Sequence, residues 1–193
     1  MRYEKGRKDT SRRRIMEVAS ERFRDDGIAA TGLASIMSDA GLTNGAFYPH
    51  FDSKAELVRE CVADALEGQA EKLLKALASG GLELVIATYL SPEHRDNPGD
   101  GCASAALLPE LARQPADTRQ LYTDRLLAMV RQMSAGLPPQ TRDPEGAVLA
   151  IYAMFVGTLQ MARAVEGTVL SDRILAVGAD AVRALAQSYQ VKG

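Results

Sequence analysis

The chain has 193 residues, of which 46% are hydrophobic, 25% charged and 5% aromatic, with a formal net charge of −2. This composition excludes a disordered chain, and two cysteines, Cys61 and Cys102, are too few for a disulfide framework. No apolar segment of the secretory type follows the N-terminus, and the longest uncharged run, Ala147–Ala162, is shorter than the ~18 residues of a membrane span. We therefore expect a cytoplasmic protein of one or two domains that makes no use of a membrane.

Charge is unevenly distributed along the chain. Residues 1–14 carry +5, which leaves −7 for the remainder of a chain whose total is −2. A basic arm on an acidic body favours a polyanionic partner near the N-terminus. The alternative is a solvated tail without a partner. The basic side chains concerned are Arg2, Lys5, Arg7, Lys8, Arg12, Arg13 and Arg14.

Helical periodicity dominates from the first apolar residues onward. Thr10 or Ser11 can cap a first helix, and "DDG" at 25–27 ends it, with Gly27 in a left-handed conformation. Its apolar face recurs at helical spacing, as Ile15, Val18, Ala19 and Phe23.

Two short helices and one long helix are predicted next. Thr31 can cap the second helix, which Gly41 ends, and the third runs from about Leu42 to His50. A capping box formed by Ser53 and Glu56 then begins a fourth helix that reaches "SGG" at 79–81.

The second half is also helical, and no strand alternation, internal repeat or low-complexity segment interrupts it. Turn-forming segments such as "SPEHRDNPGDG" and "GLPPQTRDP" separate the helices. The sequence therefore predicts an all-α chain of about nine helices. The last five are expected near residues 82–90, 102–113, 116–135, 144–166 and 172–190.

The last two predicted helices carry unusually large apolar surfaces. The helix at 144–166 is apolar nearly all round, so a single packed face cannot cover it. Two such helices favour a homodimer joined by a four-helix bundle, although a central core helix in a monomer is the alternative. The apolar residues of the final helix are Ile174, Val177, Ala181, Val182, Leu185 and Tyr189.

The second and third helices, with the turn at residues 40–42, have the spacing of a helix-turn-helix. Seven side chains are expected to face the first helix as a small core: Ala34, Ile36, Met37, Leu42, Ala46, Phe47 and Phe51. Five residues remain on the outside: Thr43, Asn44, Gly45, Tyr48 and His50. Residues at the start of the second helix of such a motif contact base edges in the major groove.

Each outer residue has a chemistry suited to DNA. Thr43 can contact a thymine methyl group, and Asn44 can form two hydrogen bonds to adenine. Gly45 lets backbone approach closely, whereas Tyr48 and His50 can reach phosphates. The cation of Lys54, beside the free N–H groups that begin the fourth helix, adds a further phosphate site. The alternative is a purely structural helical hairpin with ordinary surface residues.

From Thr10 to about Cys61 the sequence resembles the TetR family of transcriptional regulators, through "RRRIMEVASERFRDDGIAATGLASIMSDAGLTNGAFYPHFDSKAELV". The resemblance implies a homodimer on a palindromic operator, dimerisation through the last two helices and a C-terminal effector pocket. It implies that residues 1–52 form the DNA-binding domain and residues 53–193 the effector-binding and dimerisation domain.

The resemblance also assigns roles. It implies that Thr31 and Lys54 contact phosphate, that Thr43, Asn44 and Gly45 lie at bases or nearby backbone, and that Tyr48 and His50 lie mainly at phosphate. There are two departures. Asn44 stands where Lys or Arg is frequent, so no base preference is implied, and Pro49 can shorten the recognition helix.

The segment "GDGCASAALLPELARQPADTR" is similar to one in a TetR subgroup that opens a helix of the ligand domain with Gly-Cys. Cys102, near that helix N-terminus, could be a reactive sensor, because the helix dipole favours thiolate. The alternative is a small buried residue. Eight residues are candidates to line a cavity for a hydrophobic or aromatic effector, each with a plain core role as its alternative: Tyr89, Tyr122, Leu126, Met129, Met133, Tyr152, Met154 and Phe155.

His50 and His94 have no Cys or His at ligand spacing, so we expect no metal site and no cofactor. No nucleophile–base–acid spacing or phosphate loop points to an enzyme. The function expected is a ligand-responsive, dimeric, DNA-binding transcriptional regulator, with a repressor favoured. The alternatives are a helical enzyme or adapter without DNA binding and a structural dimerisation module.

Overall fold

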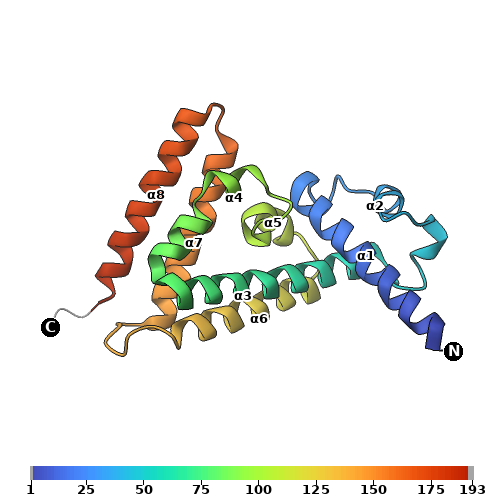
Figure 1. Ribbon diagram of the computed structural model, residues 1–193, viewed down its shortest axis with the longest axis horizontal. Coiled ribbons are helices and arrows are strands. Elements are labelled where there is room, and N and C mark those ends of the chain that lie inside the picture. The colour runs from blue at the N-terminus through green and yellow to red at the C-terminus, as the bar shows by residue number, and fades with distance from the viewer. Residues whose placement is uncertain (1, 191–193) are drawn as a thin grey trace. The chain divides into compact units, whose positions relative to one another are not determined.

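The computed structural model describes residues 2–190, with side chains from Lys8 onward, and this part of the chain is all-α, as predicted (Figure 1). The basic side chains of Arg2, Lys5 and Arg7 lie outside the described residues. Within the described residues the helices are α1 (Arg2–Asp26), α2 (Leu33–Asp39), the 3₁₀ turn η1 (Asn44–Ala46), α3 (Lys54–Tyr89), α4 (Pro92–Asp96), α5 (Ala103–Leu111), α6 (Ala116–Ser134), α7 (Pro144–Ala164) and α8 (Thr168–Ser188).

The chain divides into two compact units. Unit 1 contains the residues up to Leu66 together with Pro98–Tyr122, and unit 2 contains Glu67–Asn97 and the residues from Thr123 onward. These bounds differ from the predicted domains 1–52 and 53–193. Helix α5 and the first turns of α6 come late in the sequence, yet they belong to the same unit as the N-terminal helices.

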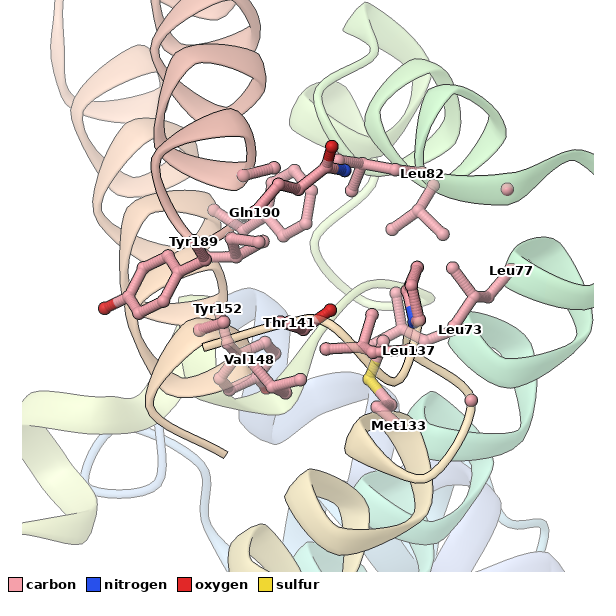
Figure 2. A pocket seen from close by; sticks show the side chains of 18 residues that line it. Leu73, Leu77, Leu82, Met133, Leu137, Thr141, Val148, Tyr152, Tyr189 and Gln190 are labelled. Carbon is pink, nitrogen blue, oxygen red and sulfur yellow. The ribbon is translucent and has the colours of Figure 1, made fainter. Parts of the chain in front are cut away.

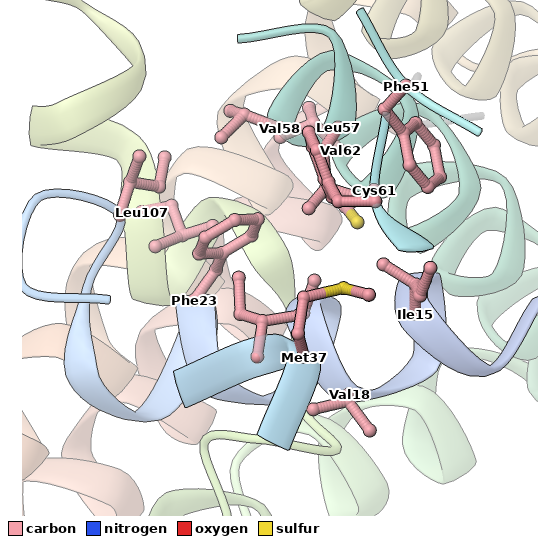
Figure 3. Packing of buried hydrophobic residues seen from close by; sticks show 14 of the residues in the cluster. Ile15, Val18, Phe23, Met37, Phe51, Leu57, Val58, Cys61, Val62 and Leu107 are labelled. Atoms are coloured by element: carbon pink, nitrogen blue, oxygen red, sulfur yellow. The ribbon is translucent and has the colours of Figure 1, made fainter. Parts of the chain in front are cut away.

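One apolar cluster holds unit 1 together, and Figure 3 shows side chains of α1, α2, α3 and α5 converging on a common centre. Phe23, Phe47 and Phe51 are each 1% exposed, and burying a side chain of this size contributes about 1.5–3 kcal/mol. Leu107 and Leu111 of α5 lie in the same cluster. The predicted core is confirmed at Ile36, Met37, Phe47 and Phe51, which are buried, and at Leu42 and Ala46, which pack against them; Ala34 is exposed, which corrects its assignment.

The turns of unit 1 follow the sequence closely. Gly27 and Gly41 have φ values of +92° and +72°, as predicted for left-handed residues that end helices. At the start of α3, the Ser53 hydroxyl accepts a hydrogen bond from the N–H of Glu56 (3.1 Å). The Glu56 carboxylate in turn accepts one from the N–H of Asp52 (2.6 Å), which completes the expected cap one residue earlier than usual.

Two predicted caps are wrong. Helix α1 begins at Arg2, so Thr10 and Ser11 lie inside it, because the preceding Lys, Arg and Glu residues are good helix formers. The cap of α2 is Gly32, because the Thr31 hydroxyl is bonded elsewhere, to the carbonyl of Gly27 (2.7 Å).

In unit 2 the predicted break at "SGG" is present as a local departure within α3. Gly80 (φ −151°) and Gly81 (φ +64°) are not helical, so α3 consists of two helical segments that meet at these residues. The expected loop after Tyr89 instead contains α4, which Ser91 caps by accepting a hydrogen bond from the N–H of His94 (3.0 Å). Two predicted helices are thus joined in α3, the predicted third helix is the 3₁₀ turn η1, and α4 is additional. The described residues therefore contain eight α-helices where about nine helices were predicted.

Helices α7 and α8 pack against each other at very close range. Gly178 of α8 lies against Thr158 of α7, and a Cβ at position 178 would fall 2.6 Å from the Thr158 Oγ1. Helix α7 is longer than the uncharged run considered above: by length and composition it could cross a membrane. The core helix of a soluble protein passes the same test, and α7 buries one face that includes Phe155 and Leu159.

We predict that Gly178→Ala destabilises the protein by about 1–3 kcal/mol, because Thr158 is β-branched and cannot move aside cheaply. Gly68→Ala is the matched control, since no atom lies within 4 Å of its added Cβ and a helical Gly→Ala change stabilises by about 0.5–1 kcal/mol. Urea denaturation of both variants checks this. Equal shifts of the two midpoints would contradict the close packing at Gly178.

A candidate nucleic-acid interface and a candidate ligand cavity

The outer residues of the helix-turn-helix lie on a short turn, not on the predicted helix from about Leu42 to His50. We call residues 43–50 the recognition turn. Its backbone bonds join residues three apart, from the N–H of Ala46 to the carbonyl of Thr43 (2.9 Å) and from that of Phe47 to Asn44 (3.2 Å). Pro49 explains the short helix, because it lacks an N–H and disfavours helical geometry at Tyr48.

The first residues of the recognition turn are exposed, and the aromatic residue that follows them is buried. Thr43, Asn44 and Gly45 are exposed, whereas Phe47 is buried and stacked on Phe51 with ring centroids 5.5 Å apart. The turn is therefore fixed to the unit 1 core while three consecutive residues face solvent. Tyr48, at 68% exposure, is also available to a partner.

His50 lies half-buried at the end of the turn, close to basic residues of α1. Burial, and then the charges of Lys8 and Arg12, lower the pKa of His50, which favours the neutral form of the ring. Arg12 itself lies over the Phe51 ring, 4.8 Å from its centroid, and pairs with Glu60. The described part of α1 thus places positive charge beside the recognition turn, and His50 lies next to it with a ring that can form a hydrogen bond.

Two predicted phosphate ligands have contacts within the protein. Thr31 is 2% exposed, and its hydroxyl donates to the Gly27 carbonyl, so a phosphate contact would require it to leave this bond. The Lys54 ammonium donates to the carbonyl of Ile28 (2.6 Å). Their assignment to phosphate stays a prediction, and the structure adds a second role for each, which is to hold the turn between α1 and α2.

That turn is fixed from its other side by a residue that the sequence gives no reason to single out. The carboxylate of Glu110, on α5, accepts hydrogen bonds from the N–H groups of Ile28 (3.1 Å) and Ala29 (2.8 Å). With Lys54 on the Ile28 carbonyl, both sides of this residue's backbone are bound, and we call the arrangement the Ile28 clamp. It gives the orientation of α2, and so of the recognition turn, a direct dependence on α5.

The predicted effector residues divide between the units. Cys102 (0% exposed) and Tyr122 belong to unit 1, where the Tyr122 hydroxyl lies 3.0 Å from the Ser104 hydroxyl. Cys102 occupies the N-cap position of α5, as expected, but complete burial favours the packing alternative over a reactive sensor. Cys61 is buried too, and burial raises its pKa to about 12.

Unit 2 contains a cavity of about 320 Å³, close to the ~300 Å³ lower bound for pockets that hold small ligands. Figure 2 shows Leu73 and Leu77 on one side and Val148 and Tyr152 across from them, with the Tyr189 hydroxyl directed away. The lining residues are Leu73, Leu77, Gly81, Leu82, Val85, Met133, Gly136, Leu137, Pro138, Thr141, Ala147, Val148, Ile151, Tyr152, Phe155, Ala186, Tyr189 and Gln190.

Three of the predicted effector residues, Met133, Tyr152 and Phe155, line this cavity. Tyr89 stands behind its wall, with its ring stacked on Phe155 at 4.8 Å. Leu126 and Met154 are half-buried and Met129 is buried, and none of these three lines it. The sequence missed the loop and C-terminal contributions, although "GLPP" and the helical spacing of Leu73 and Leu77 could have indicated them.

The recognition turn has counterparts in known proteins. A family profile described as "Bacterial regulatory proteins, tetR family" matches residues 15–61, the segment from α1 to α3 that holds the turn. Over 69 residues the chain is 42% identical to the HTH-type transcriptional regulator TtgR of Pseudomonas putida, covering 36% of this chain and 32% of TtgR. Over 88 residues it is 33% identical to the HTH-type transcriptional repressor KstR2 of Mycolicibacterium smegmatis, covering 42% of each.

The segment from α1 to the start of α3 is therefore that of the TetR family of regulatory proteins. Solved structures agree on the fold of the whole chain. A TetR-family regulator from Cytophaga hutchinsonii has a TM-score of 0.77 at 18% identity, covering 97% of this chain and 98% of its own. The reduced form of NemR from E. coli has a TM-score of 0.74 at 18% identity, covering 91% and 96%. The sequence matches to TtgR and KstR2 span less than half of those relatives' own length. The match to the family profile lies in the N-terminal part of this chain.

Proposed function

We propose that this protein is a DNA-binding transcriptional regulator of the TetR family that represses from a palindromic operator as a homodimer and is released by a small-molecule effector. The observation that carries the proposal is the recognition turn, where Thr43, Asn44 and Gly45 are exposed in sequence while Phe47 and Phe51 hold the turn to the core. The name of the relative KstR2, a transcriptional repressor, supports the sign of regulation.

The surroundings of the turn support DNA as the partner. Lys8, Arg13 and Arg14 on α1 are exposed, and Lys8 is close enough to His50 to lower its pKa. Basic residues beside a reading element supply the phosphate contacts that position it on a duplex. In this arrangement Thr43 and Asn44 contact base edges, and Tyr48 and His50 contact phosphates.

The exposed faces of α7 and α8 support a homodimer. On α7, Leu149, Ala153 and Met161 are exposed at four- and eight-residue spacing, which places them on one face. On α8, Val177 is 59% exposed. Apolar faces on two adjacent antiparallel helices suit an isologous four-helix bundle, and two recognition turns about 34–36 Å apart would then meet successive major grooves.

The cavity in unit 2 supports an effector. Release requires only that the effector bind the non-binding conformation more tightly, and a hundredfold change in operator affinity needs under ~3 kcal/mol of preference. We propose regulation and not catalysis as the activity, with the cytoplasm, where the operator is, as the location.

A gel shift with duplexes from the DNA flanking the gene, repeated across salt concentrations, tests the regulator. We expect specific binding that weakens steeply as salt rises, because phosphate contacts release counterions. Binding of the same strength to unrelated duplexes at every salt concentration would contradict a specific operator.

We predict that Asn44→Ala relaxes the base preference, at a cost of about 1–3 kcal/mol on the preferred operator, because a bidentate base contact is lost. Tyr48→Phe is the matched change at the same turn, and it should weaken binding to all sequences alike. Lys54→Ala should also act uniformly, with its thermal denaturation measured because Lys54 belongs to the Ile28 clamp. Competition gel shifts with single-base operator variants give the comparison, and equal losses across sequences for Asn44→Ala would mean that the reading face is misassigned.

A further inference from the structure

The cavity in unit 2 differs from a site for a charged ligand in one decisive respect. Among the described residues that line it, none is Asp, Glu, Lys, Arg or His. A charge moved from water into such surroundings needs a counter-ion or several hydrogen bonds, and its binding is strongly disfavoured without them.

The polar groups of the lining can satisfy little more than one or two ligand atoms. Apart from Tyr189, whose hydroxyl is directed away (Figure 2), the lining residues with O or N atoms in their side chains are Thr141, Tyr152 and Gln190. The other side chains are aliphatic, aromatic or thioether. Such a lining fits a ligand whose surface is mostly apolar.

One wall of the cavity is aromatic and another is built from methionine and loop residues. Phe155 is backed by Tyr89, whose ring is stacked on it, and Tyr89 meets Tyr152 edge-on with centroids 6.5 Å apart. This aromatic wall is fixed on α7. Met133 and the loop at 136–141 form another part of the lining, and methionine adapts readily to different ligand shapes.

The cavity also spans the break in α3. Leu73 and Leu77 line it from before Gly80–Gly81, whereas Leu82 and Val85 line it from after. A ligand in contact with both pairs would favour one angle between the two helical segments.

The loop after α6 is bonded to the end of α8 beside the cavity. The N–H of Arg142 donates to the carbonyl of Tyr189 (2.8 Å), and Thr141 pairs with Gln190 in an isolated antiparallel bridge. These bonds hold the loop that carries Leu137 and Pro138 against the end of α8. The ligand is thereby surrounded by four separate segments, from α3, α6 and its following loop, α7 and the end of α8.

We infer that this cavity binds an uncharged, predominantly apolar small molecule that bridges the two segments of α3 across Gly80–Gly81. The inference rests on the proposed function, because it names the chemistry of the effector through which that function is regulated. It excludes carboxylates, phosphates and other anions as ligands of this cavity.

Two fluorescent probes of nearly the same skeleton test the charge requirement on the full chain. 1-N-Phenylnaphthylamine is neutral, and 8-anilinonaphthalene-1-sulfonate adds one negative charge. We expect the neutral probe to bind at least about tenfold more tightly. Ala186→Trp, which fills the cavity from α8, should weaken the neutral probe by about tenfold or more, while Ala128→Trp, at an exposed position of α6 outside the lining, should not.

A charge-introducing variant keeps the test independent of folding at Ala186. Leu137→Lys places an ammonium group on the cavity wall and should shift the preference toward the anionic probe by about tenfold or more. Gln140→Lys adds the same charge to the same loop at an exposed position outside the lining, and it should leave the preference unchanged. Circular dichroism melting of each variant confirms that it is folded.

Each outcome decides the inference. Tighter binding of the sulfonate to the unaltered protein, lost in Ala186→Trp, would overturn the requirement for a neutral ligand. Probe binding that neither Ala186→Trp nor Leu137→Lys changes would overturn the cavity as the site. The gel shift distinguishes failure of this inference from failure of the proposed function. Probe binding as expected, without specific DNA binding, would contradict the proposed function alone. Specific DNA binding, without the expected probe binding, would contradict this inference alone.

Discussion

Ala153→Arg is expected to convert the proposed homodimer into a monomer and to weaken operator binding by about a hundredfold or more. The reason is avidity: a dimer places two recognition turns on one duplex, so the second contact is intramolecular and adds a factor of about 10²–10⁴. Ala153 is exposed in the middle of the α7 face that we assign to the dimer, and an arginine there would bury a charge opposite its own symmetry mate.

Ala128→Arg is the control for this prediction, because it adds the same side chain at an exposed position of α6. Size-exclusion chromatography with light scattering gives the mass of each variant, and gel shifts give the affinity. A dimeric Ala153→Arg protein with normal operator binding would mean that α7 does not form the interface.

Glu110→Ala is expected to destabilise unit 1 by about 2 kcal/mol, since hydrogen bonds to a charged group contribute about 1.5–3 kcal/mol and this carboxylate is half-exposed. Removal of the carboxylate releases the N–H groups of Ile28 and Ala29 and frees one side of the Ile28 clamp. We therefore also expect weaker binding to all DNA sequences, because α2 and the recognition turn lose a fixed orientation. Glu110→Gln should be intermediate, because its single carbonyl oxygen can satisfy one N–H.

The control for Glu110 is Glu83→Ala, which removes an exposed ion pair with Arg183. Exposed pairs of this kind contribute little to stability, so the urea midpoint of Glu83→Ala should be close to that of the unaltered protein. Equal loss of stability in the two variants would contradict the role of the Glu110 carboxylate as part of a clamp.

The features that were predicted correctly from the sequence depend on interactions between residues close together in the chain. Gly27 and Gly41 adopt the left-handed conformations that end α1 and follow α2, and Ser53 with Glu56 caps α3. Each depends on residues within a few positions of one another. The exposed run from Thr43 to Gly45 was predicted for the same reason, because the apolar pattern on either side allows only one face to be buried.

The features that the sequence did not predict depend on distant residues. Glu110 lies 82 positions from Ile28, and no sequence pattern near either residue predicts the contact. Thr31 looked like a helix cap because its alternative partner, the Gly27 carbonyl, is brought to it only by the turn. The recognition turn is shorter than its apolar spacing suggested, because the effect of Pro49 on the preceding backbone outweighed the pattern.

The residues that line the cavity could not be predicted from the sequence for a different reason. Apolar residues that line a hollow and apolar residues that fill a core have the same spacing on a helix, so Met133, Tyr152 and Phe155 could not be told from Met129 by pattern. What separates them is the loop after α6 and the end of α8, which leave space beside some side chains and not others.

Leu107 and Leu111 belong to the unit 1 core, and this affects the design of chimeras that exchange ligand-binding domains between members of the family. A chimera joined at residue 52 would pair the N-terminal helices with a foreign α5, and their apolar faces would then meet side chains that they were not shaped for. An exchange that respects the packing must transfer Pro98–Tyr122 together with the first 66 residues, so grafting the reading half of this protein requires three junctions in the chain and not one.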